Sequence, residues 1–428
     1  MGQQFRVITF GCKVNQYEGE LVRQRLSALG WTEAREHAPF DLGVVNTCTV
    51  TDRSERKSRQ MIRSLTRHHP EASILVTGCY AVSDPETLSR LPGVAAVIPD
   101  KSDLLHHLDR LAGKDNGMVL PSPALSAHTS RTRAILKVQD GCNAHCAYCI
   151  IPHVRPRPGS KPMEVVLAEA RALAAAGHRE LVVTGIHVGL YGVDLGPEHS
   201  LGELLARLGD VDSIWRIRLS SVELLEIPDR LIELMRESDR FCPHLHVPLQ
   251  SGDDEVLARM NRRYTGAQFL ARASQLLDAV PVMSLTTDVI VGFPGETEAA
   301  FRHTMEVARR LSFSKIHVFP FSPRRGTSAA TMSGQVDPET VRRRRDLMLT
   351  LSDELGLGFR QGFLNKTVEV LVESTGNVCG APLDGLTPHY VRVRLSGGSI
   401  RSGERVRALV RSVDAHVMVG EAIADETA

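Results

Sequence analysis

The sequence predicts an α/β protein in three parts: an open, mostly parallel sheet in residues 1–125, a partial barrel of six β–α units in 126–362, and a small antiparallel β-barrel in 363–428. The first prediction rests on strand-like runs that alternate with helical patterns, as parallel sheets require. The second rests on six further β–α units, too few for the eight of a full barrel. The third rests on the alternation of apolar and polar residues in the tail.

In the first part, four strand-like runs each precede a helical pattern. The strands are expected at 5–9, 41–46, 73–77 and 94–98, and the helices near 15–29, 52–67, 84–91 and 102–112. Open parallel sheets bind ligands beyond the carboxyl ends of their strands. Any site in this part is therefore expected at the residues that directly follow a strand.

Three cysteines occupy such positions. Cys12, Cys48 and Cys79 follow the first, second and third strands. If they were only small core hydrophobes, nothing would place all three at one edge of the sheet. We therefore expect a three-cysteine metal cluster at this edge. Asn15 and Asn46 could hydrogen-bond the surroundings of the cluster or cap helices.

In the second part, a linker rich in proline, serine and small residues is expected at 116–133. The barrel strands are expected at 134–140, 180–185, 214–220, 244–250, 285–292 and 314–320, with the clearest helical pattern at 163–177. Residues that follow barrel strands form the catalytic face in barrels of this kind.

The loop after the first barrel strand, GCNAHCAYCI (141–150), contains Cys142, Cys146 and Cys149. Three thiolates this close fit a loop around one metal centre, and thiolates select zinc, copper or iron–sulfur clusters. Zinc with His145 or His153 as a fourth ligand is one alternative, and plain buried thiols are another. An iron–sulfur cluster with three cysteine ligands leaves one iron open for a small molecule.

Polar residues and glycines follow the other barrel strands and predict a pocket for a polar small molecule beside this loop. Glu223 could accept hydrogen bonds from an amino group or hydroxyls, and Tyr148 could stack on a ring or pack structurally. The candidate pocket residues are Tyr148, Gly185, Ser221, Glu223, Gln250 and Gly292.

In the tail, half-buried strands are expected at 366–374, 389–395, 403–413 and 416–422. Period-two alternation places Arg392 and Arg394 on one face of the second strand, opposite Val391 and Val393. A basic ladder on an exposed sheet suits contact with an RNA backbone, although a solvated face explains it equally well.

The totals exclude several classes of protein. The 428 residues carry 51 Lys and Arg against 50 Asp and Glu, so no global basic field indicates a nucleic-acid partner. No apolar run is long enough to span a membrane, and the N-terminus lacks the features of a signal peptide, so a cytoplasmic protein is expected. Cysteines in such a chain indicate metal or catalysis rather than disulfides. Cys242 and Cys379 fit no cluster pattern and are interpreted as ordinary thiols.

Taken together, these motifs identify a resemblance. The C-x3-C-x2-C loop resembles that of radical S-adenosylmethionine (SAM) enzymes, and the chain as a whole resembles their methylthiotransferase family, most of all the branch that acts on N6-threonylcarbamoyladenosine in tRNA. The motifs that carry the resemblance are TFGCKVNQYE (9–18), NTCTVT (46–51), TGCYA (77–81), DGCNAHCAYCIIP (140–152), TGIHVGLYGVDL (184–195), LSSVE (219–223), HVPLQSG (246–252), DVIVGFPGETE (288–298) and FPFSPRRGT (319–327).

The resemblance implies two [4Fe-4S] clusters. Cys142, Cys146 and Cys149 would hold the one that cleaves SAM, and Cys12, Cys48 and Cys79 an auxiliary one that carries the sulfur. One SAM would donate a methyl group to that sulfur, and a second would supply the radical that abstracts hydrogen from C2 of adenine. The resemblance assigns no catalytic acid or base, and it implies an electron donor such as a flavodoxin or ferredoxin and an unknown sulfur donor. The tail resembles the RNA-binding TRAM domain.

The chain departs from the family pattern after the cysteine loop, where Pro156 and Gly159 replace a glycine and an arginine. Arg155, Arg157 and Lys161 still leave a basic strip there that could contact the substrate. Val82, in place of a common glutamine, is not expected to be a ligand.

Two further residues and one run bear on substrate binding. Arg324 and Arg325, at the end of the last barrel strand, are placed to meet phosphates. The run Arg342 to Arg345 points around a helix, so part of it is expected to be solvated.

Other functions are also compatible with these motifs. The target could be isopentenyladenosine in tRNA or a ribosomal protein, although the residues around Cys12 argue against both. From another class, the chain could be a non-catalytic RNA-binding protein that contains iron–sulfur clusters or zinc.

Overall fold

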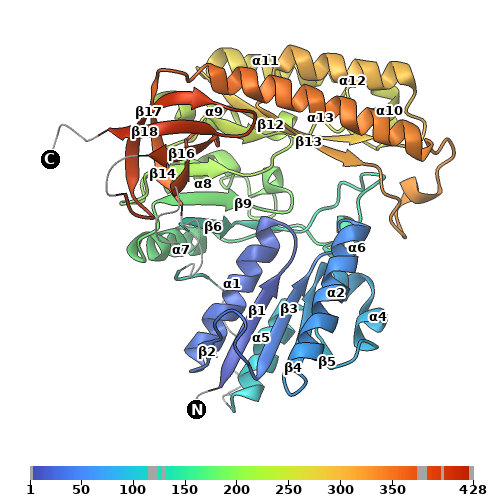
Figure 1. Ribbon diagram of the computed structural model, residues 1–428, viewed down its shortest axis with the longest axis vertical. Helices are drawn as coiled ribbons and strands as arrows, with labels where there is room; N and C mark the ends of the chain where they lie inside the picture. The colour runs from blue at the N-terminus through green and yellow to red at the C-terminus, as the bar shows by residue number, and fades with distance from the viewer. Residues whose placement is uncertain (1–2, 114–123, 128–131, 374–382, 397–399, 424–428) are drawn as a thin grey trace.

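The computed structural model describes residues 3–113, 124–127, 132–373, 383–396 and 400–423. Figure 1 shows an N-terminal sheet below a central barrel, with a small β-barrel at the left of the view. This architecture confirms the predicted fold class. The predicted domain limits stay predictions, and most of the predicted linker, like Cys379, lies outside the described residues.

The N-terminal sheet is open and fully parallel, in the order β2-β1-β3-β4-β5. Its strands are β1 (Gln4–Thr9), β2 (Thr32–Glu33), β3 (Leu42–Thr47), β4 (Ser73–Gly78) and β5 (Val94–Val97). The helices are α1 (Lys13–Ala28), α2 (Asp52–His68), α3 (Cys79–Ser83), α4 (Pro85–Ser89) and α5 (Lys101–Leu111). All six residues of β3 are buried, which a central strand covered on both faces requires. The two-residue β2 and the single-turn α3 are too short to show a period and were not predicted.

The central part is a partial barrel of six parallel strands in two three-stranded sheets, β10-β9-β6 and β11-β12-β13. Isolated parallel bridges, Ile217 with Phe241 and Ser221 with His246, connect the two sheets around β10 and β11. The strands are β6 (Arg133–Lys137), β9 (Glu180–Thr184), β10 (Arg216–Leu219), β11 (His244–His246), β12 (Ser284–Val291) and β13 (Lys315–Pro320). The outer helices are α7 (Met163–Ala175), α8 (Leu201–Gly209), α9 (Asp229–Glu237), α10 (Asp254–Arg259), α11 (Gly266–Ala279), α12 (Glu298–Leu311) and α13 (Pro338–Gln361).

Two predicted strands were too long. The run expected at 134–140 breaks after Lys137, because Gln139 and Asp140 turn away to form β7 (Gln139–Asp140), which pairs with β8 (Gly159–Ser160). The run expected at 244–250 ends at His246 as a regular strand. Beyond it the chain keeps only isolated pairing, at Gln250 with Val289.

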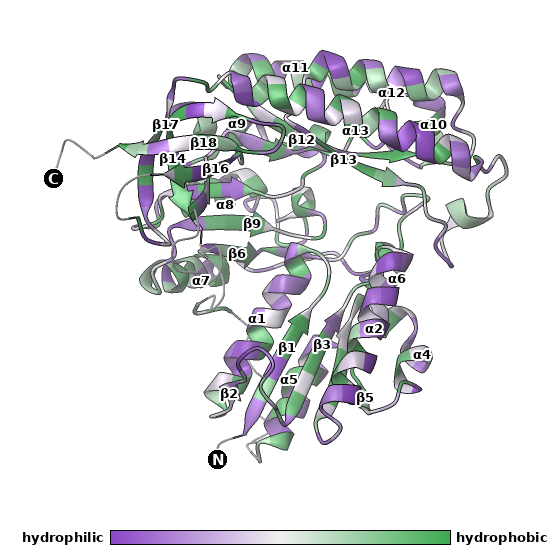
Figure 2. Ribbon diagram, in the orientation of Figure 1, coloured by the Kyte–Doolittle hydropathy of each residue, from purple (hydrophilic) through white to green (hydrophobic). Residues whose placement is uncertain are grey.

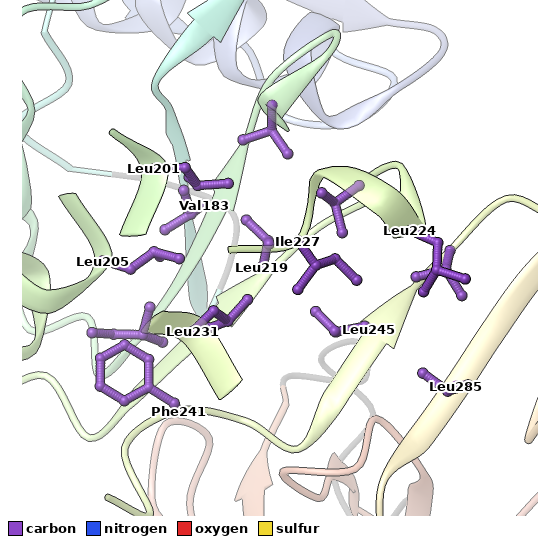
Figure 3. Close-up of a cluster of buried hydrophobic side chains, with 14 of the residues drawn as sticks. Val183, Leu201, Leu205, Leu219, Leu224, Ile227, Leu231, Phe241, Leu245 and Leu285 are labelled. Atoms are coloured by element: carbon purple, nitrogen blue, oxygen red, sulfur yellow. The ribbon is translucent and has the colours of Figure 1, made fainter. Parts of the chain in front are cut away.

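The main core lies between the barrel strands and the outer helices. In Figure 2, β6 and β9 are green along their length, whereas α12 and α13 are banded in purple and green. All five residues of β9 are buried, while α12 buries one face only. Figure 3 shows this core at β9, β10 and β11, with side chains from α8 and α9 facing the strands.

The C-terminal part is a closed barrel in the order β14-β15-β16-β18-β17. Its strands are β14 (Thr367–Val372), β15 (Leu383–Leu386), β16 (Arg392–Ser396), β17 (Arg405–Val413) and β18 (Met418–Ile423). The pairing is antiparallel except between β16 and β18. Four strands were predicted and β15 was missed, because LDGL has no alternating pattern. Gly385 is required there, since a Cβ atom would lie 2.4 Å from Val370.

This small barrel packs on the amino ends of the barrel strands. Arg216 and Arg218 of β10 donate hydrogen bonds to the carbonyl oxygens of Leu386 and Pro388, respectively, both at 2.8 Å. Tyr390 stacks on His244 at the start of β11, with ring centroids 4.7 Å apart. The cysteine loop lies at the opposite, carboxyl ends of the strands. Among the described residues, no helix has the length and apolar character needed to cross a membrane.

Candidate functional site

The three N-terminal cysteines meet at the carboxyl edge of the first sheet. Cys12 is the N-cap residue of α1, Cys48 follows β3 directly, and Cys79 begins α3. A Cβ atom on Gly11 would lie 2.9 Å from Sγ of Cys48, so the loop that carries Cys12 touches Cys48. Cys48 and Cys79 are buried and Cys12 is exposed. The structure thus brings together three thiols that are far apart in sequence.

Asn15 and Asn46 brace these loops and do not cap helices. The buried Asn15 donates hydrogen bonds to the carbonyl oxygens of Phe10, at 2.9 Å, and Thr47, at 3.0 Å. Its Oδ1 lies 3.9 Å from Sγ of Cys79 and accepts from that thiol. Asn46 donates to the carbonyl oxygen of Asn15 at 2.8 Å. One buried amide therefore links all three cysteine-bearing loops.

The second set, Cys142, Cys146 and Cys149, lies on the loop between β7 and α6 (Ile151–Val154). The backbone N–H of Cys142 donates to the carbonyl oxygen of Arg155 at 3.0 Å, which closes the base of the loop. Gly141 has φ +75°, and a Cβ atom there would lie 2.0 Å from the carbonyl oxygen of Arg157. Only glycine allows this crossing of the two chain segments.

Cationic groups face a sulfur atom in both sets. Nη1 of Arg262 lies 3.5 Å from Sγ of Cys146, and Nε of Arg155 lies 3.4 Å from Sγ of Cys79. Nδ1 of His187 lies 3.4 Å from Sγ of Cys142. Burial alone would lower the pKa of His187, but hydrogen bonds with Cys142 and Glu226 raise it to about 10. Each cation would offset the negative charge of a thiolate bound to a cluster.

Two sets of three thiols are the donor type that iron–sulfur clusters use. Among the described residues, no group of three or more His, Cys, Asp and Glu side chains is arranged to hold one metal ion. The three thiolates of a four-iron cubane bind three different irons, so they stand farther apart than the ligands of one zinc ion. Burial raises the pKa of Cys149 to about 12, so a metal must displace the proton of this thiol. His145 and His153, the alternative zinc ligands, are both exposed.

The two cysteine sets lie beside each other. Cys79 packs in one apolar cluster with Ile150, which follows Cys149, and with Val154 of α6. Arg155 continues this contact, because it donates to Asn15 at 3.0 Å as well as to Cys79. A cavity of about 670 Å³ opens next to Cys79, between α1, the start of α5 and the β7–β8 hairpin.

Several predicted pocket residues support the cysteine loop. A Cβ atom on Gly185 would lie 2.9 Å from Oε1 of Gln139. Gln139 accepts from the backbone N–H of His187 at 2.8 Å and donates to the carbonyl oxygen of Gly141 at 2.8 Å. Gly185 therefore lets the second barrel strand approach the base of the cysteine loop.

Tyr148 and Glu223 already have protein partners. The ring of Tyr148 meets Phe293 edge-on, with centroids 6.5 Å apart, in a mainly apolar cluster. Glu223 forms an ion pair with Arg262 and keeps a quarter of its side chain exposed. Tyr148 thus packs structurally in this conformation, whereas Glu223 remains available at the edge of the barrel.

The other three predicted pocket residues lie at strand ends on the same side. Gln250 is buried with φ +62°, and its backbone bonds to Asp288 at 2.8 Å and Ile290 at 2.9 Å. Gly292 has φ +75°, and its N–H donates to Glu296 at 2.7 Å. Ser221 is exposed and forms an isolated bridge with His246. A non-glycine residue with positive φ, such as Gln250, is strained and clusters at functional sites.

The predicted substrate arginines differ in their surroundings. Arg155 is ion-paired to Glu18 and Asp140, each at 2.8 Å, and Arg324 is buried against Glu55 and Thr49 near Cys48. Both guanidinium charges are therefore compensated by carboxylates of the protein itself. Arg157 is exposed beside the cavity.

The other predicted substrate arginines lie on the C-terminal barrel. Arg392 and Arg394 are exposed on one face of β16, with Val393 buried behind them, so the predicted alternation is confirmed. Each of the two arginines shares Asp384, at 3.5 and 3.4 Å.

Sequence reasoning missed four residues that this site uses. His187 stood in the strand end TGIH but was given no role. Gln139, Glu18 and Arg262 had no local signal, because their partners lie far away in the sequence: the 2.8 Å contact between Glu18 and Arg155, for example, joins the first and second parts of the chain.

Comparison with known proteins agrees with this geometry. Residues 136–308 match the radical SAM superfamily, and residues 4–99 match the uncharacterized protein family UPF0004. Among solved structures, the radical SAM methyltransferase TsrM from Kitasatospora setae superimposes with a TM-score of 0.56 at 16% identity, over 77% of each chain. The fold and the cysteine loop thus define a radical SAM protein.

Curated relatives show which family of radical SAM proteins the chain resembles. The threonylcarbamoyladenosine tRNA methylthiotransferase MtaB of Bacillus subtilis is 39% identical over 94% of this chain and 92% of the relative. That of Thermotoga maritima is 35% identical over 94% and 93%. The tRNA-2-methylthio-N(6)-dimethylallyladenosine synthase of Desulfitobacterium hafniense is 33% identical over 98% and 97%. The chain belongs to the family of radical SAM tRNA methylthiotransferases.

Proposed function

We propose that this protein adds a methylthio group to C2 of N6-threonylcarbamoyladenosine next to the anticodon of tRNA, giving 2-methylthio-N6-threonylcarbamoyladenosine. The observation that carries this proposal is the meeting of two three-cysteine sets at one edge of a partial barrel, where Cys79 packs against Ile150. A single cluster would suffice to cleave SAM. A second set beside it supports an insertion of sulfur.

In this proposal Cys142, Cys146 and Cys149 hold one [4Fe-4S] cluster, and Cys12, Cys48 and Cys79 hold the other. Once bound, these groups supply the electron that cleaves SAM and the sulfur that is transferred. Gly185, Ser221, Gln250 and Gly292 would border the SAM site at the strand ends, and the free side of Glu223 would accept hydrogen bonds from the amino group or ribose of SAM.

Side chains of the protein hold positive charge against the cysteine sulfur atoms. Arg262 and His187 donate to the sulfur atoms of Cys146 and Cys142, and such N–H···S bonds tune the potential of a cluster. Glu226 orients His187 from its other nitrogen at 2.8 Å. Arg155 performs the same task at Cys79 while its other nitrogens hold Glu18 and Asp140.

The remaining parts of the proposal concern partners and organisation. Residues 1–125 carry the auxiliary cluster, 126–362 the SAM chemistry and 363–428 a TRAM-like RNA-binding domain. The enzyme works in the cytoplasm, and a flavodoxin or ferredoxin supplies the electrons. Arg157 of the exposed strip, with Arg392 and Arg394 of β16, contacts the RNA.

The test is mass spectrometry of nucleosides from total tRNA, with and without the gene. We expect 2-methylthio-N6-threonylcarbamoyladenosine to disappear in the deletion strain and its unmethylthiolated precursor to accumulate. Loss of the isopentenyl product instead would move the target within tRNA. An unchanged profile would contradict tRNA as the substrate and direct the search to ribosomal proteins.

A further inference from the structure

Helix α2 carries a local concentration of positive charge on its outer side. Its 17 residues contain six Lys and Arg against two Asp and Glu, in a chain whose formal net charge is only +1. Because an α-helix has 3.6 residues per turn, the five exposed cations of α2 fall within about a third of its circumference. They form one surface, which we call the α2 stripe: Arg53, Arg56, Lys57, Arg63 and Arg67.

The opposite face of α2 fixes the direction of the stripe. Ile62 and Leu65 are buried in the apolar cluster that α2 shares with β3 and β4. Arg59, the sixth cation, belongs to this inner side, where it donates to the hydroxyl of Tyr80 at 2.5 Å and pairs with Glu55 at 3.7 Å. The stripe therefore faces away from the sheet and toward solvent.

Carboxylates of the protein leave most of the charge of the stripe uncompensated. Arg56 forms an ion pair with Asp52, one turn earlier in the helix. In the part of the chain that the structure describes, no carboxylate lies within ion-pair distance of the other four cations of the stripe. Four exposed arginines of the small C-terminal barrel differ, because each has a carboxylate within 3.5 Å: Arg392, Arg394, Arg405 and Arg411.

The stripe begins at the junction of the two cysteine sets. The loop that follows Cys48 leads directly into α2. Glu55, in the first turn of α2, forms an ion pair with Arg324, which follows the last barrel strand. In Figure 1, α2 runs from this junction along the N-terminal sheet, away from the barrel. From its first to its last cation the stripe spans about 21 Å, at a rise of 1.5 Å per residue.

We propose that the α2 stripe binds the sugar–phosphate backbone of the tRNA whose adenosine reaches the cysteine sets. This inference rests on the proposed function, which places the reacting nucleotide at the junction where the stripe begins. RNA that leaves this junction can follow α2 for the length of the stripe. Four of the five cations are arginines, whose planar fork of donors suits phosphate. Contacts of this kind position the RNA without reading its sequence.

The chemistry of the stripe favours RNA over an acidic protein. A specific protein interface has an apolar core with large anchoring side chains, surrounded by polar residues. Among the described residues, none of the large apolar side chains that are exposed belongs to α2. A row of cations without an apolar centre offers no such anchor. A phosphate backbone, in contrast, is bound mainly through charge.

The test removes three charges from the stripe and measures affinity at several salt concentrations. The RNA is a tRNA that carries N6-threonylcarbamoyladenosine next to its anticodon. Arg53→Gln, Lys57→Gln and Arg63→Gln are combined, because glutamine keeps a high helix propensity. The logarithm of affinity falls with that of salt by about 0.7 to 0.9 for each phosphate contact. We expect the triple variant to reduce this slope by roughly 2 to 3 and to bind roughly 10- to 100-fold more weakly at about 0.1 M salt.

A second triple variant removes the same charge from the outer side of the barrel. Arg302, Arg309 and Arg310 are exposed on α12, which lies away from the N-terminal sheet (Figure 1). Their combined replacement with glutamine should leave the salt slope nearly unchanged. Equal losses in the two triple variants would overturn the proposal, because net charge alone would then explain both. Arg53→Lys with Arg63→Lys, which keeps the charge, should retain the salt slope of the wild type.

The measurements use the reconstituted holoenzyme, and an iron content of about eight per chain shows that both clusters are loaded. A stripe variant with the affinity and salt slope of the wild type would overturn the proposal. If that variant were instead reduced more slowly by an acidic electron-carrier protein, the stripe would be a docking surface for protein. If the wild-type enzyme binds tRNA through the stripe but forms no methylthio product, the proposed function fails and the RNA-binding surface stands.

Discussion

Arg155 is a single side chain on which several parts of the site depend. Its guanidinium donates to Glu18, Asp140, Asn15 and the sulfur of Cys79. Burial alone would raise the pKa of Glu18, but Lys137, Arg155 and Lys101 outweigh burial and hold it well below its usual range. Glu18 therefore stays charged inside the protein, and this charge requires its cationic partners.

Replacing Arg155 with Met should lower the free energy of unfolding by about 3 kcal/mol, because it leaves a buried carboxylate with incomplete compensation. Denaturation in urea measures this change. The control is Arg157→Met, two residues away and exposed, for which a change within about 0.5 kcal/mol is expected. Equal effects of the two changes would show that the buried network does not contribute to stability.

The two cysteine sets should be separable by substitution. Cys149→Ala should abolish the formation of 5′-deoxyadenosine from SAM and leave the auxiliary cluster in place, because it removes a ligand from one site only. Cys48→Ala should do the reverse, sparing 5′-deoxyadenosine and stopping methylthio transfer. Product analysis and iron content measure both. A Cys48→Ala enzyme that still forms the methylthio product would refute the role given to the first sheet.

The junction of β4 and α3 shows how an element positions a ligand. Gly78 ends β4 with φ +95°, and a Cβ atom there would lie 2.3 Å from the carbonyl oxygen of Thr47 and 2.5 Å from Oδ1 of Asn46. The chain thus turns tightly against the neighbouring strand before Cys79. No residue with a Cβ atom fits this turn without displacing its neighbours.

Gly78→Ala should therefore displace Cys79 and lose the auxiliary cluster, about four of eight irons, with SAM cleavage retained. Gly177→Ala is the matched control: its φ is also +95°, but nothing lies within 4 Å of its Cβ position. It should show only backbone strain, about 1–2 kcal/mol. Iron analysis and unfolding measurements distinguish the two. Full iron content in Gly78→Ala would contradict the close contact.

The three parts of the chain are joined through buried charges. Arg216 and Arg218 are each 2% exposed and share Glu180, which is fully buried. Arg216 also forms an ion pair with Glu369 of β14 at 2.7 Å. Cζ of Arg218 lies over the ring of Tyr390, 4.9 Å from its centroid. On the other side, Arg324 joins the end of the barrel to Glu55 of α2. Buried pairs of this kind fix one arrangement of the parts, since a shifted arrangement leaves charges unpaired.

This joint should make stability depend on pH. Burial alone would raise the pKa of Glu180, but Arg218, Arg133 and Arg216 outweigh burial and lower it. The stability that Glu180 contributes is therefore present above the pKa of an unfolded glutamate, about 4.3, and is lost as the pH falls through its lower folded pKa. Glu180→Gln should destabilise the protein by about 3 kcal/mol at pH 7, with a difference from wild type that shrinks below about pH 4.3.

Chemical denaturation at several pH values measures this difference. Glu233→Gln serves as the control, because its ion pair with Arg230 is about half exposed and contributes at most about 1 kcal/mol. A Glu180→Gln difference that stayed constant in acid would mean that the charge of Glu180 does not stabilise the fold.

Much of this architecture is present in local patterns. The hydrophobic period of a strand or helix reflects which of its faces is buried. This period was enough to predict the parallel sheet, the six-stranded partial barrel and the alternation in β16. The six candidate ligand cysteines were predicted from their place after strands and from the spacing of one loop, and their role as cluster ligands stays a prediction. The parts that were missed, such as β2, α3 and β15, are too short or too irregular to carry a period.

Tertiary structure alone decided which polar residues act together. Arg155 and Arg324 look like free cations in the sequence, yet folding buries them against Glu18 and Glu55. An ion pair depends on three-dimensional distance, and these partners are separated by up to several hundred residues. Local sequence determines which face of an element is buried, but the packing of whole parts determines which charges meet.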